Sequence, residues 1–156
     1  MADILIIIPC GLGKIWDKHP NAGAIKANDA YTGAPFKVNR EFAERFSDRW
    51  VILNAKYGFI DPDFIIPGPY NVSFKKKSTE PIEIDTLIQQ IRKMGLNKYG
   101  KVVGLGGKEY RWAMEAAFKT YEAEVQFPFA GLPIGKAMRA IKEAIKPGSW
   151  RMRPDG

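Results

Sequence analysis

The sequence predicts a single three-layer α/β domain, with a mostly parallel central sheet of about four strands flanked by helices. Short runs of β-branched apolar residues alternate along the chain with amphipathic helical patterns. That order gives a mostly parallel sheet with helices packed on its faces. The chain has 156 residues, the size of one ordinary domain, and contains no internal repeat or low-complexity linker.

Four segments are predicted to be strands. Residues 4–9 form a continuous apolar run, which is typical of a strand that is covered on both faces. Residues 50–54 and 101–105 have a similar character. The segment at residues 123–127 is shorter and more polar, so we expect this strand to lie nearer an edge of the sheet.

Four helices are predicted from apolar positions at helical spacing. The first covers residues 38–46 and follows Pro35, a good first-turn residue. The second covers residues 84–94 and ends at a glycine. The third has its apolar stripe within residues 112–117, including Trp112, and the fourth covers residues 134–145 before a Pro-Gly stop.

Composition indicates a soluble protein of a reducing compartment. Cys10 is the single cysteine, which excludes an internal disulfide. The apolar run at residues 4–8 follows Asp3 and is too short for a signal peptide core or a membrane span. We expect a cytoplasmic protein without membrane association, with one domain over residues 1–148 and a loosely ordered basic tail over residues 149–156.

Glycine-bearing loops follow all four predicted strands. Ligands of open α/β sheets bind outside the carboxyl ends of the strands, where glycine permits close backbone approach and free N–H groups attract anions. Strand-to-helix turns need glycine in any case, but four such loops on one edge predict a ligand site. Candidate ligand contacts from these loops are Cys10, Gly11, Tyr57, Gly58, Gly107 and Tyr110, with Lys14, Lys56 and Lys108 as candidate phosphate contacts.

The known cofactor signatures are absent. Residues 11–14 lack the spacing of a P-loop, and residues 104–107 lack the third glycine of a dinucleotide fingerprint because Glu109 stands there. One histidine and one cysteine give no recurring metal-ligand spacing. We therefore expect no metal and no cofactor. A Cys10–His19 nucleophile pair is an alternative to the interpretation of Cys10 as a small residue at a tight strand end.

Two long loops, residues 26–33 and 61–73, carry polar and aromatic side chains that the fold does not obviously need. Asp29 and Asp63 are the candidate catalytic carboxylates, although each also suits a turn or a helix cap. Tyr31 and Tyr70, together with the tyrosine at 57, are candidates for stacking on a flat ring. Asn71 is a candidate for hydrogen bonding to a base edge.

The net charge points to a polyanionic partner. Its formal value is +7, and each phosphate that Lys or Arg neutralises releases counterions. A charged, solvated surface is the alternative interpretation. Candidate contacts to a phosphate backbone follow the second loop, at Lys75, Lys76 and Lys77.

The chain also resembles a known family in motifs that cover most of its length. They are Cys10-Gly11 with Lys14, residues 27–33, residues 50–63 with Tyr57-Gly58, Pro69-Tyr70-Asn71, residues 106–110 and residues 128–135. These motifs are similar to the DUF6884 family of small bacterial and phage domains. Residues 57–70 resemble, more distantly, peroxide-stress YaaA proteins and a domain that accompanies archaeosine synthesis.

These resemblances imply a uracil-DNA-glycosylase-like fold, with a pocket for an extruded base and phosphate-contacting loops around it. The water-activating Gly-Gln-Asp-Pro-Tyr motif of uracil glycosylases is not present. We expect an enzyme that acts on an N-glycosidic bond of a nucleobase. Its expected partner is a nucleic acid, DNA in preference to RNA. The alternatives are a non-catalytic nucleic-acid-binding module and an enzyme of a free nucleotide.

Overall fold

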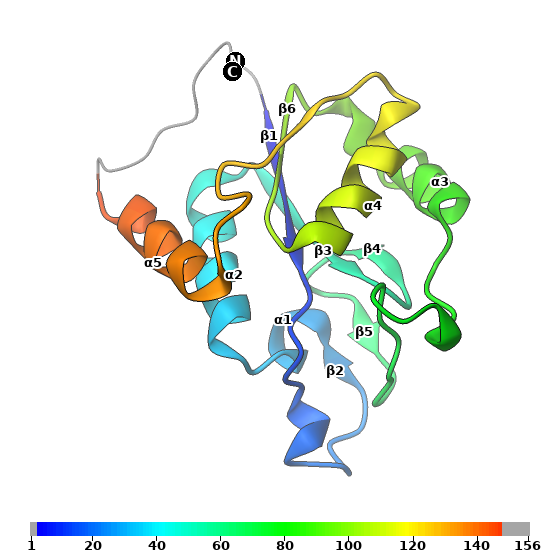
Figure 1. Ribbon diagram of the computed structural model, residues 1–156. Coiled ribbons are helices and arrows are strands. Elements are labelled where there is room, and N and C mark those ends of the chain that lie inside the picture. Colours follow the sequence, from blue (N-terminus) through cyan, green and yellow to red (C-terminus); the bar gives the residue numbers. More distant parts are fainter. Residues whose placement is uncertain (1–2, 148–156) are drawn as a thin grey trace.

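The computed structural model describes residues 3–147 and has the α/β class that the sequence predicts (Figure 1). Among these residues the central sheet has five strands in the order β4-β3-β1-β6-β7. Three pairings, β3 with β1, β1 with β6 and β6 with β7, are parallel. The strands are β1 (Ile4–Pro9), β3 (Arg49–Asn54), β4 (Gly58–Ile60), β6 (Lys101–Gly104) and β7 (Val125–Gln126).

The fifth strand makes the sheet mixed, which corrects the expectation of about four strands. β4 pairs antiparallel with β3, so the segment after β3 is a hairpin turn rather than a strand-to-helix loop. Gly58 allows this reversal because it has a φ of +78°, a conformation that glycine adopts without strain. The finer expectation, a uracil-DNA-glycosylase-like fold, stays a prediction.

Helices cover both faces of the sheet. α2 (Ala34–Phe46) and α5 (Ile134–Ile145) lie on one side, and α3 (Ile84–Met94) and α4 (Lys108–Lys119) lie on the other (Figure 1). Alternation along β1 supplies both cores: Ile6 and Ile8 face α2 and α5, whereas Leu5 and Ile7 belong to the cluster with α3 and α4. The predicted three layers are therefore present.

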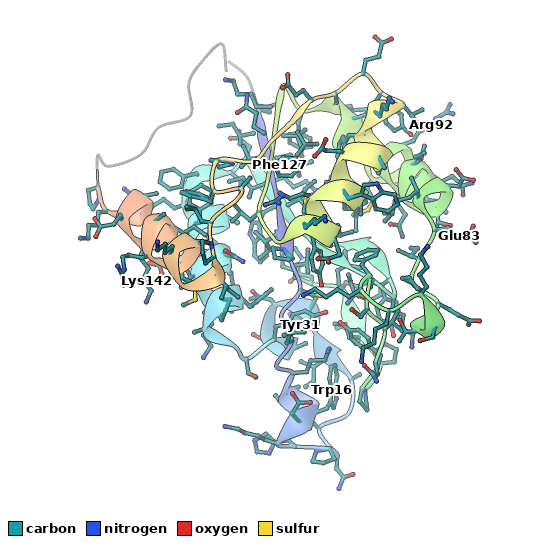
Figure 2. All side chains as sticks on the ribbon, viewed as in Figure 1. Trp16, Tyr31, Glu83, Arg92, Phe127 and Lys142 are labelled. Atoms are coloured by element: carbon teal, nitrogen blue, oxygen red, sulfur yellow. The ribbon has the colours of Figure 1, made fainter. Side chains whose placement is uncertain are left out.

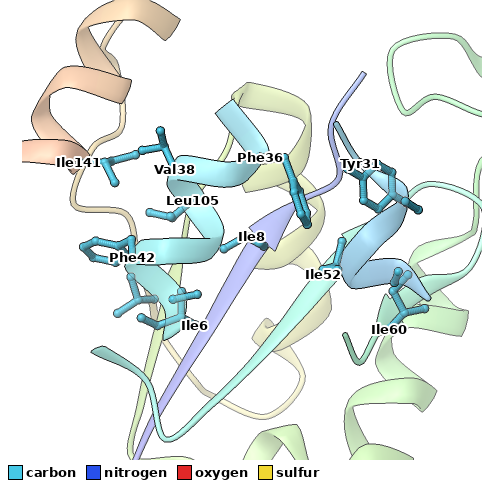
Figure 3. Packing of buried hydrophobic residues seen from close by; sticks show 14 of the residues in the cluster. Ile6, Ile8, Tyr31, Phe36, Val38, Phe42, Ile52, Ile60, Leu105 and Ile141 are labelled. Carbon is cyan, nitrogen blue, oxygen red and sulfur yellow. The ribbon is translucent and has the colours of Figure 1, made fainter. Parts of the chain in front are cut away.

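Large apolar side chains fill the core between α2, α5 and the sheet. Phe36 and Phe42 of α2 pack against Ile8 and its neighbours, and Ile141 reaches the same cluster from α5 (Figure 3). The expected stripe on α4 is partly wrong, because Trp112 is 61% exposed. Two positions of the predicted stripe, Ala113 and Ala117, are buried as expected, and Met114 and Phe118 are buried with them.

A smaller unit extends beyond the carboxyl end of β1 and was not predicted as regular structure. β2 (Ile25–Lys26) pairs antiparallel with β5 (Ile65–Ile66), and the one-turn helix α1 (Ala27–Ala30) follows β2 directly (Figure 1). The short 3-10 turns are η1 (Ile15–Asp17), η2 (Lys77–Thr79) and η3 (Leu96–Lys98). This unit joins the two long loops that the sequence marks as functional.

The helices within residues 3–147 are short. No helix in that part of the chain is long and apolar enough to cross a bilayer. The predicted basic tail, residues 149–156, lies outside the described residues, and the single-domain boundary stays a prediction.

Candidate functional site

The carboxyl ends of β1 and β3 lie side by side in the middle of the sheet. Pro9 is in register with Leu53, and the Cys10 N–H donates a hydrogen bond to the Leu53 carbonyl over 3.1 Å. Cys10 and Asn54 are therefore the first residues past that registered pair. The parallel sheet places chemically distinctive side chains at the edge where α/β proteins bind ligands.

Asn54 is the polar residue that organises this edge, and its side chain is completely buried. Its Nδ2 donates to the hydroxyls of Tyr31 and Tyr70. Its Oδ1 accepts the backbone N–H groups of Lys56, at 2.7 Å, and Tyr57, at 3.0 Å. Both hydrogens and both lone-pair directions of the amide are thus used, which fixes its orientation.

Asn54 was missing from the sequence-based candidates. It ends an apolar strand and looks like an ordinary turn residue there. A polar residue that closes a buried strand and precedes a turn is the signal that would have found it, because such a residue needs hydrogen-bond partners in the core.

Two further hydrogen bonds complete the arrangement. The hydroxyls of Tyr31 and Tyr70 bond to each other, and the Cys10 thiol bonds to the Tyr110 hydroxyl over 3.1 Å. We call Cys10, Tyr31, Asn54, Tyr70 and Tyr110 the thiol–tyrosine cluster. Figure 2 shows Tyr31 between the central sheet and the segment that carries Trp16. Five separate chain segments contribute to the cluster, so the fold and not local sequence brings it together.

A close backbone approach brings Tyr110 to Cys10. Gly106 has a φ of +128°, and a Cβ built there would lie 3.1 Å from the Tyr110 Cβ and 3.2 Å from two Pro9 side-chain carbons. Any larger residue at 106 would push the end of β6 away from the end of β1. Gly107 is the exposed N-cap of α4, and its neighbour Tyr110 lies in the first turn of that helix.

The cluster is electrically neutral over a wide pH range. Burial raises the pKa of the Cys10 thiol above its ordinary value of 9.0, although the Tyr110 hydrogen bond and the charge of Lys14 oppose this. Burial is also the main cause that raises the pKa of the Tyr31, Tyr70 and Tyr110 hydroxyls. At neutral pH the cluster therefore offers protonated hydroxyl and thiol donors, not a reactive thiolate.

Two predicted phosphate contacts, Lys14 and Lys56, lie over tyrosine rings at the edge of this cluster. The Lys14 Nζ is 4.8 Å from the centroid of the Tyr70 ring, and the Lys56 Nζ is 5.2 Å from the Tyr57 ring. The Tyr57 and Tyr70 rings meet edge to face with centroids 5.8 Å apart. Lysine ammonium groups beside these two rings make this part of the protein both aromatic and positive.

The candidate carboxylates Asp29 and Asp63 lie on neighbouring segments at the surface. The Asn28 N–H donates to the Pro62 carbonyl over 2.9 Å, which joins the segment of Asp29 to that of Asp63. Both aspartates are exposed, and within residues 3–147 neither makes a side-chain hydrogen bond or ion pair. The structure therefore brings the two loops together, but no hydrogen bond links either carboxylate to the thiol–tyrosine cluster.

The other predicted contacts divide into two groups. Gly11 packs against Tyr31 and Phe36. Gly58 is buried, and a Cβ there would lie 2.0 Å from the Gln90 Oε1, so the fold itself requires this glycine. The exposed candidates are Asn71, Lys75, Lys76, Lys77 and Lys108. The run of three lysines follows Phe74, and the Phe74 ring lies 5.4 Å from the Tyr110 ring, centroid to centroid.

The described part of the chain shows no metal centre at the cluster. Residues 3–147 contain no group of three or more His, Cys, Asp or Glu side chains that could hold a metal ion. A shallow hollow on α3 is lined by Thr86, Gln89, Gln90, Arg92, Lys93 and Met94. It contains none of the cluster residues.

Comparison with known proteins identifies the family. The model of DUF6884, a family of unknown function, matches residues 10–143. The chain belongs to this family. It is 36% identical over 143 residues to the uncharacterized protein YfjM of Bacillus subtilis (strain 168), covering 91% of this chain and 95% of YfjM. The matched range of the DUF6884 model contains every residue of the cluster.

Among solved structures, the chain resembles the crystal structure of AF0587, a protein of unknown function. The TM-score is 0.46 and the sequence identity is 14%. The match covers 94% of this chain but only 45% of the AF0587 chain. This DUF6884 domain therefore spans less than half of the length of that protein.

Proposed function

We propose that this DUF6884 protein binds DNA and acts on a nucleobase at the thiol–tyrosine cluster, by hydrolysing or exchanging an N-glycosidic bond. The observation that carries the proposal is the pair of ammonium groups, Lys14 and Lys56, over the rings of Tyr70 and Tyr57. Aromatic faces suit stacking on a base, and ammonium groups beside them suit the phosphates that flank it.

The neutral cluster supports the bond cleavage. In hydrolysis, the oxygen of water bonds to the anomeric carbon as the C–N bond breaks, and the electron pair leaves with the base. The departing base develops negative charge, which preorganised hydroxyl donors stabilise strongly in a buried site. The high pKa of Tyr70 and Tyr110 keeps these donors protonated at neutral pH. The proton that water loses finally resides on the released base.

Asp29 or Asp63 supplies the carboxylate in this proposal. It orients the water, or stabilises the positive charge that develops on the sugar. The backbone bond between Asn28 and Pro62 keeps the two segments together, so the same part of the small unit carries both carboxylates. Positioning and electrostatics provide the rate, and the proposal needs no metal or cofactor.

One observation favours a second candidate, a nucleic-acid-binding module without catalysis. Asp29 and Asp63 are both exposed, and the hydrogen bonds of the cluster involve no carboxylate. In that case the stacking surface and the lysines would act alone. The two candidates share their DNA-binding residues and differ in whether the carboxylates matter.

Strand release separates these candidates. End-labelled DNA that carries uracil, hydroxymethyluracil, deazaguanine or glucosylated cytosine is incubated with the protein and treated with alkali. We expect alkali-labile sites that disappear in Asp29→Asn or Asp63→Asn, but persist in the control Asp85→Asn, an exposed carboxylate on α3. Salt-sensitive binding without strand release would favour the binding module. Absence of both would refute the proposed function.

A further inference from the structure

The side chain of Asn54 gives the hydrogen bonds of the thiol–tyrosine cluster a fixed starting direction. Its Oδ1 accepts the backbone N–H groups of Lys56 and Tyr57, and a backbone N–H can only donate. The amide must therefore turn its NH2 group toward the tyrosines, and its two hydrogens go to the hydroxyl oxygens of Tyr31 and Tyr70. Both hydroxyls accept at this point, so each still has one hydrogen to donate.

The two hydroxyl hydrogens have different destinations. Tyr31 is only 2% exposed, and within the described residues its hydroxyl bonds to Asn54 and Tyr70. A buried hydrogen without an acceptor is costly, so Tyr31 donates to Tyr70. The Tyr70 hydrogen then points elsewhere, and a hydrogen bond from the Tyr70 hydroxyl lowers the pKa of the Cys10 thiol. Donation thus runs from Asn54 through both tyrosines to the sulfur.

Cys10 passes this direction on to Tyr110. Its sulfur accepts from the Tyr70 hydroxyl and from the Ala55 backbone N–H, which are two donors for two lone pairs. The remaining bond of the thiol is to the Tyr110 hydroxyl, 3.1 Å away, and there the thiol donates its own hydrogen. The Tyr110 oxygen accepts in that bond, so the hydrogen of its hydroxyl is not used by any hydrogen bond among residues 3–147.

The packing around Tyr110 holds that hydroxyl at the edge of the site. Tyr110 lies half-buried in the first turn of α4, at the carboxyl edge of the sheet. The Phe74 ring meets its ring edge to face, with centroids 5.4 Å apart, and Gly106 allows its close approach to Pro9. A hydroxyl whose oxygen accepts a hydrogen bond is also a stronger donor, because successive hydrogen bonds polarise one another.

We propose that the cluster is one directed chain of hydrogen bonds that ends in the Tyr110 hydroxyl, whose hydrogen is the one donated to the ligand. Tyr110 is then a catalytic residue, Cys10 positions it, and Tyr31 and Tyr70 are internal links. This inference rests on the proposed function for the identity of the acceptor, which is the departing base, where a preorganised donor stabilises the developing negative charge. The direction of the chain does not depend on that function.

The direction is tested by the S–H stretching band of Cys10, which Raman spectroscopy can assign because the chain has one cysteine. A thiol that donates a hydrogen bond has this band at lower frequency than a thiol that does not. Tyr110→Phe keeps the ring and removes the acceptor, and the control is Tyr121→Phe, whose hydroxyl donates to the Ile88 carbonyl outside the cluster. We expect the band to move to higher frequency in Tyr110→Phe and to stay in place in Tyr121→Phe. An unmoved band in Tyr110→Phe would overturn the chain.

The role of Tyr110 is tested by single-turnover strand release, with affinity measured by anisotropy on the same DNA. Tyr110→Phe should slow release by about 100-fold at unchanged affinity, the usual effect of removing one preorganised donor. Cys10→Ala should slow release by about tenfold, and Cys10→Ser, which keeps a donor to Tyr110, should restore most of the rate. Tyr121→Phe should behave as the unchanged protein.

The failure of this inference and the failure of the proposed function give different results. If Tyr110→Phe is as fast as the unchanged protein, Tyr110 is not the donor; if Cys10→Ser is as slow as Cys10→Ala, Cys10 does not position it. Either result overturns the inference while strand release by the unchanged protein persists. If the unchanged protein releases no strand, the proposed function fails together with donation to a base, and the S–H band still decides the direction of the chain.

Discussion

Replacement of Asn54 by leucine is the most direct test of the hydrogen-bond network that underlies the site. Leucine has the same number of side-chain heavy atoms and the same branch point at Cγ, so the change removes four hydrogen bonds without opening a cavity. The backbone N–H groups of Lys56 and Tyr57 lose their acceptor, and the hydroxyls of Tyr31 and Tyr70 lose a donor. The hydroxyls can still bond to each other, whereas the two amides have no other partner among the bonds of the described residues.

The expected cost follows from those two amides. A buried donor without an acceptor costs about 1–3 kcal/mol, and both groups are partly reachable by water, so we expect about 2–4 kcal/mol in total. Domains of this size unfold with about 5–15 kcal/mol, so the loss is a large fraction of the stability. With a urea m-value of about 2 kcal/mol/M, the unfolding midpoint should fall by about 1–2 M.

Urea unfolding followed by circular dichroism measures this shift. Asn71→Leu is the matched control, because Asn71 is exposed and its change should stay within about 0.5 kcal/mol. A cycle with Tyr31→Phe isolates the hydroxyl part: removing that hydroxyl should cost about 1 kcal/mol less once Asn54 is already leucine. An Asn54→Leu midpoint equal to that of the control would refute the view that this amide organises the edge.

Three further outcomes are expected. Gly58→Ala should lower the free energy of unfolding by about 2–3 kcal/mol, because the added Cβ would meet the hydrogen-bonded side chain of Gln90. The control Gly23→Ala should lower it by about 1 kcal/mol, because Gly23 has a similar φ of +77° but open space around it. Burial raises the pKa of Cys10, so this thiol should not affect the free energy of unfolding below pH 9. Above pH 9 the free energy of unfolding should decline, because the thiol ionises more easily in the unfolded chain, and Cys10→Ala should reduce that decline. Lys56→Gln should lower the salt slope of DNA binding by about 0.9, with no change for the control Lys119→Gln at the far end of α4.

The central fold was predictable because its signals are local. β1 and α5 have the predicted bounds, and α3 also ends where Gly95 adopts a left-handed conformation. Such elements follow from hydrophobic periodicity and from stop residues within one segment. β4 and the β2–β5 pair were missed because strands of two or three residues carry no periodicity, and only their partners define them.

The site was predictable as a location but not as a network. Glycine loops at the carboxyl edge and the tyrosines in the long loops pointed to the region that contains Cys10, Tyr31, Tyr70 and Tyr110. The pairing of these groups depends on five segments that are far apart in the chain, with separations of up to 100 residues. Asn54 was missed because its role arises from burial, which a sequence pattern alone does not reveal at a strand end.

The distribution of charge at this edge limits the kind of ligand that it can bind. The five cluster residues are uncharged at neutral pH, since burial raises the pKa of the thiol and of the three hydroxyls. Positive charge is supplied separately, by lysines on the rings of Tyr57 and Tyr70. A ligand with a neutral, hydrogen-bonding flat part and a separate anionic part fits both features, and a nucleotide has that construction. Salt should therefore weaken the binding of the anionic part and leave the preference among bases unchanged.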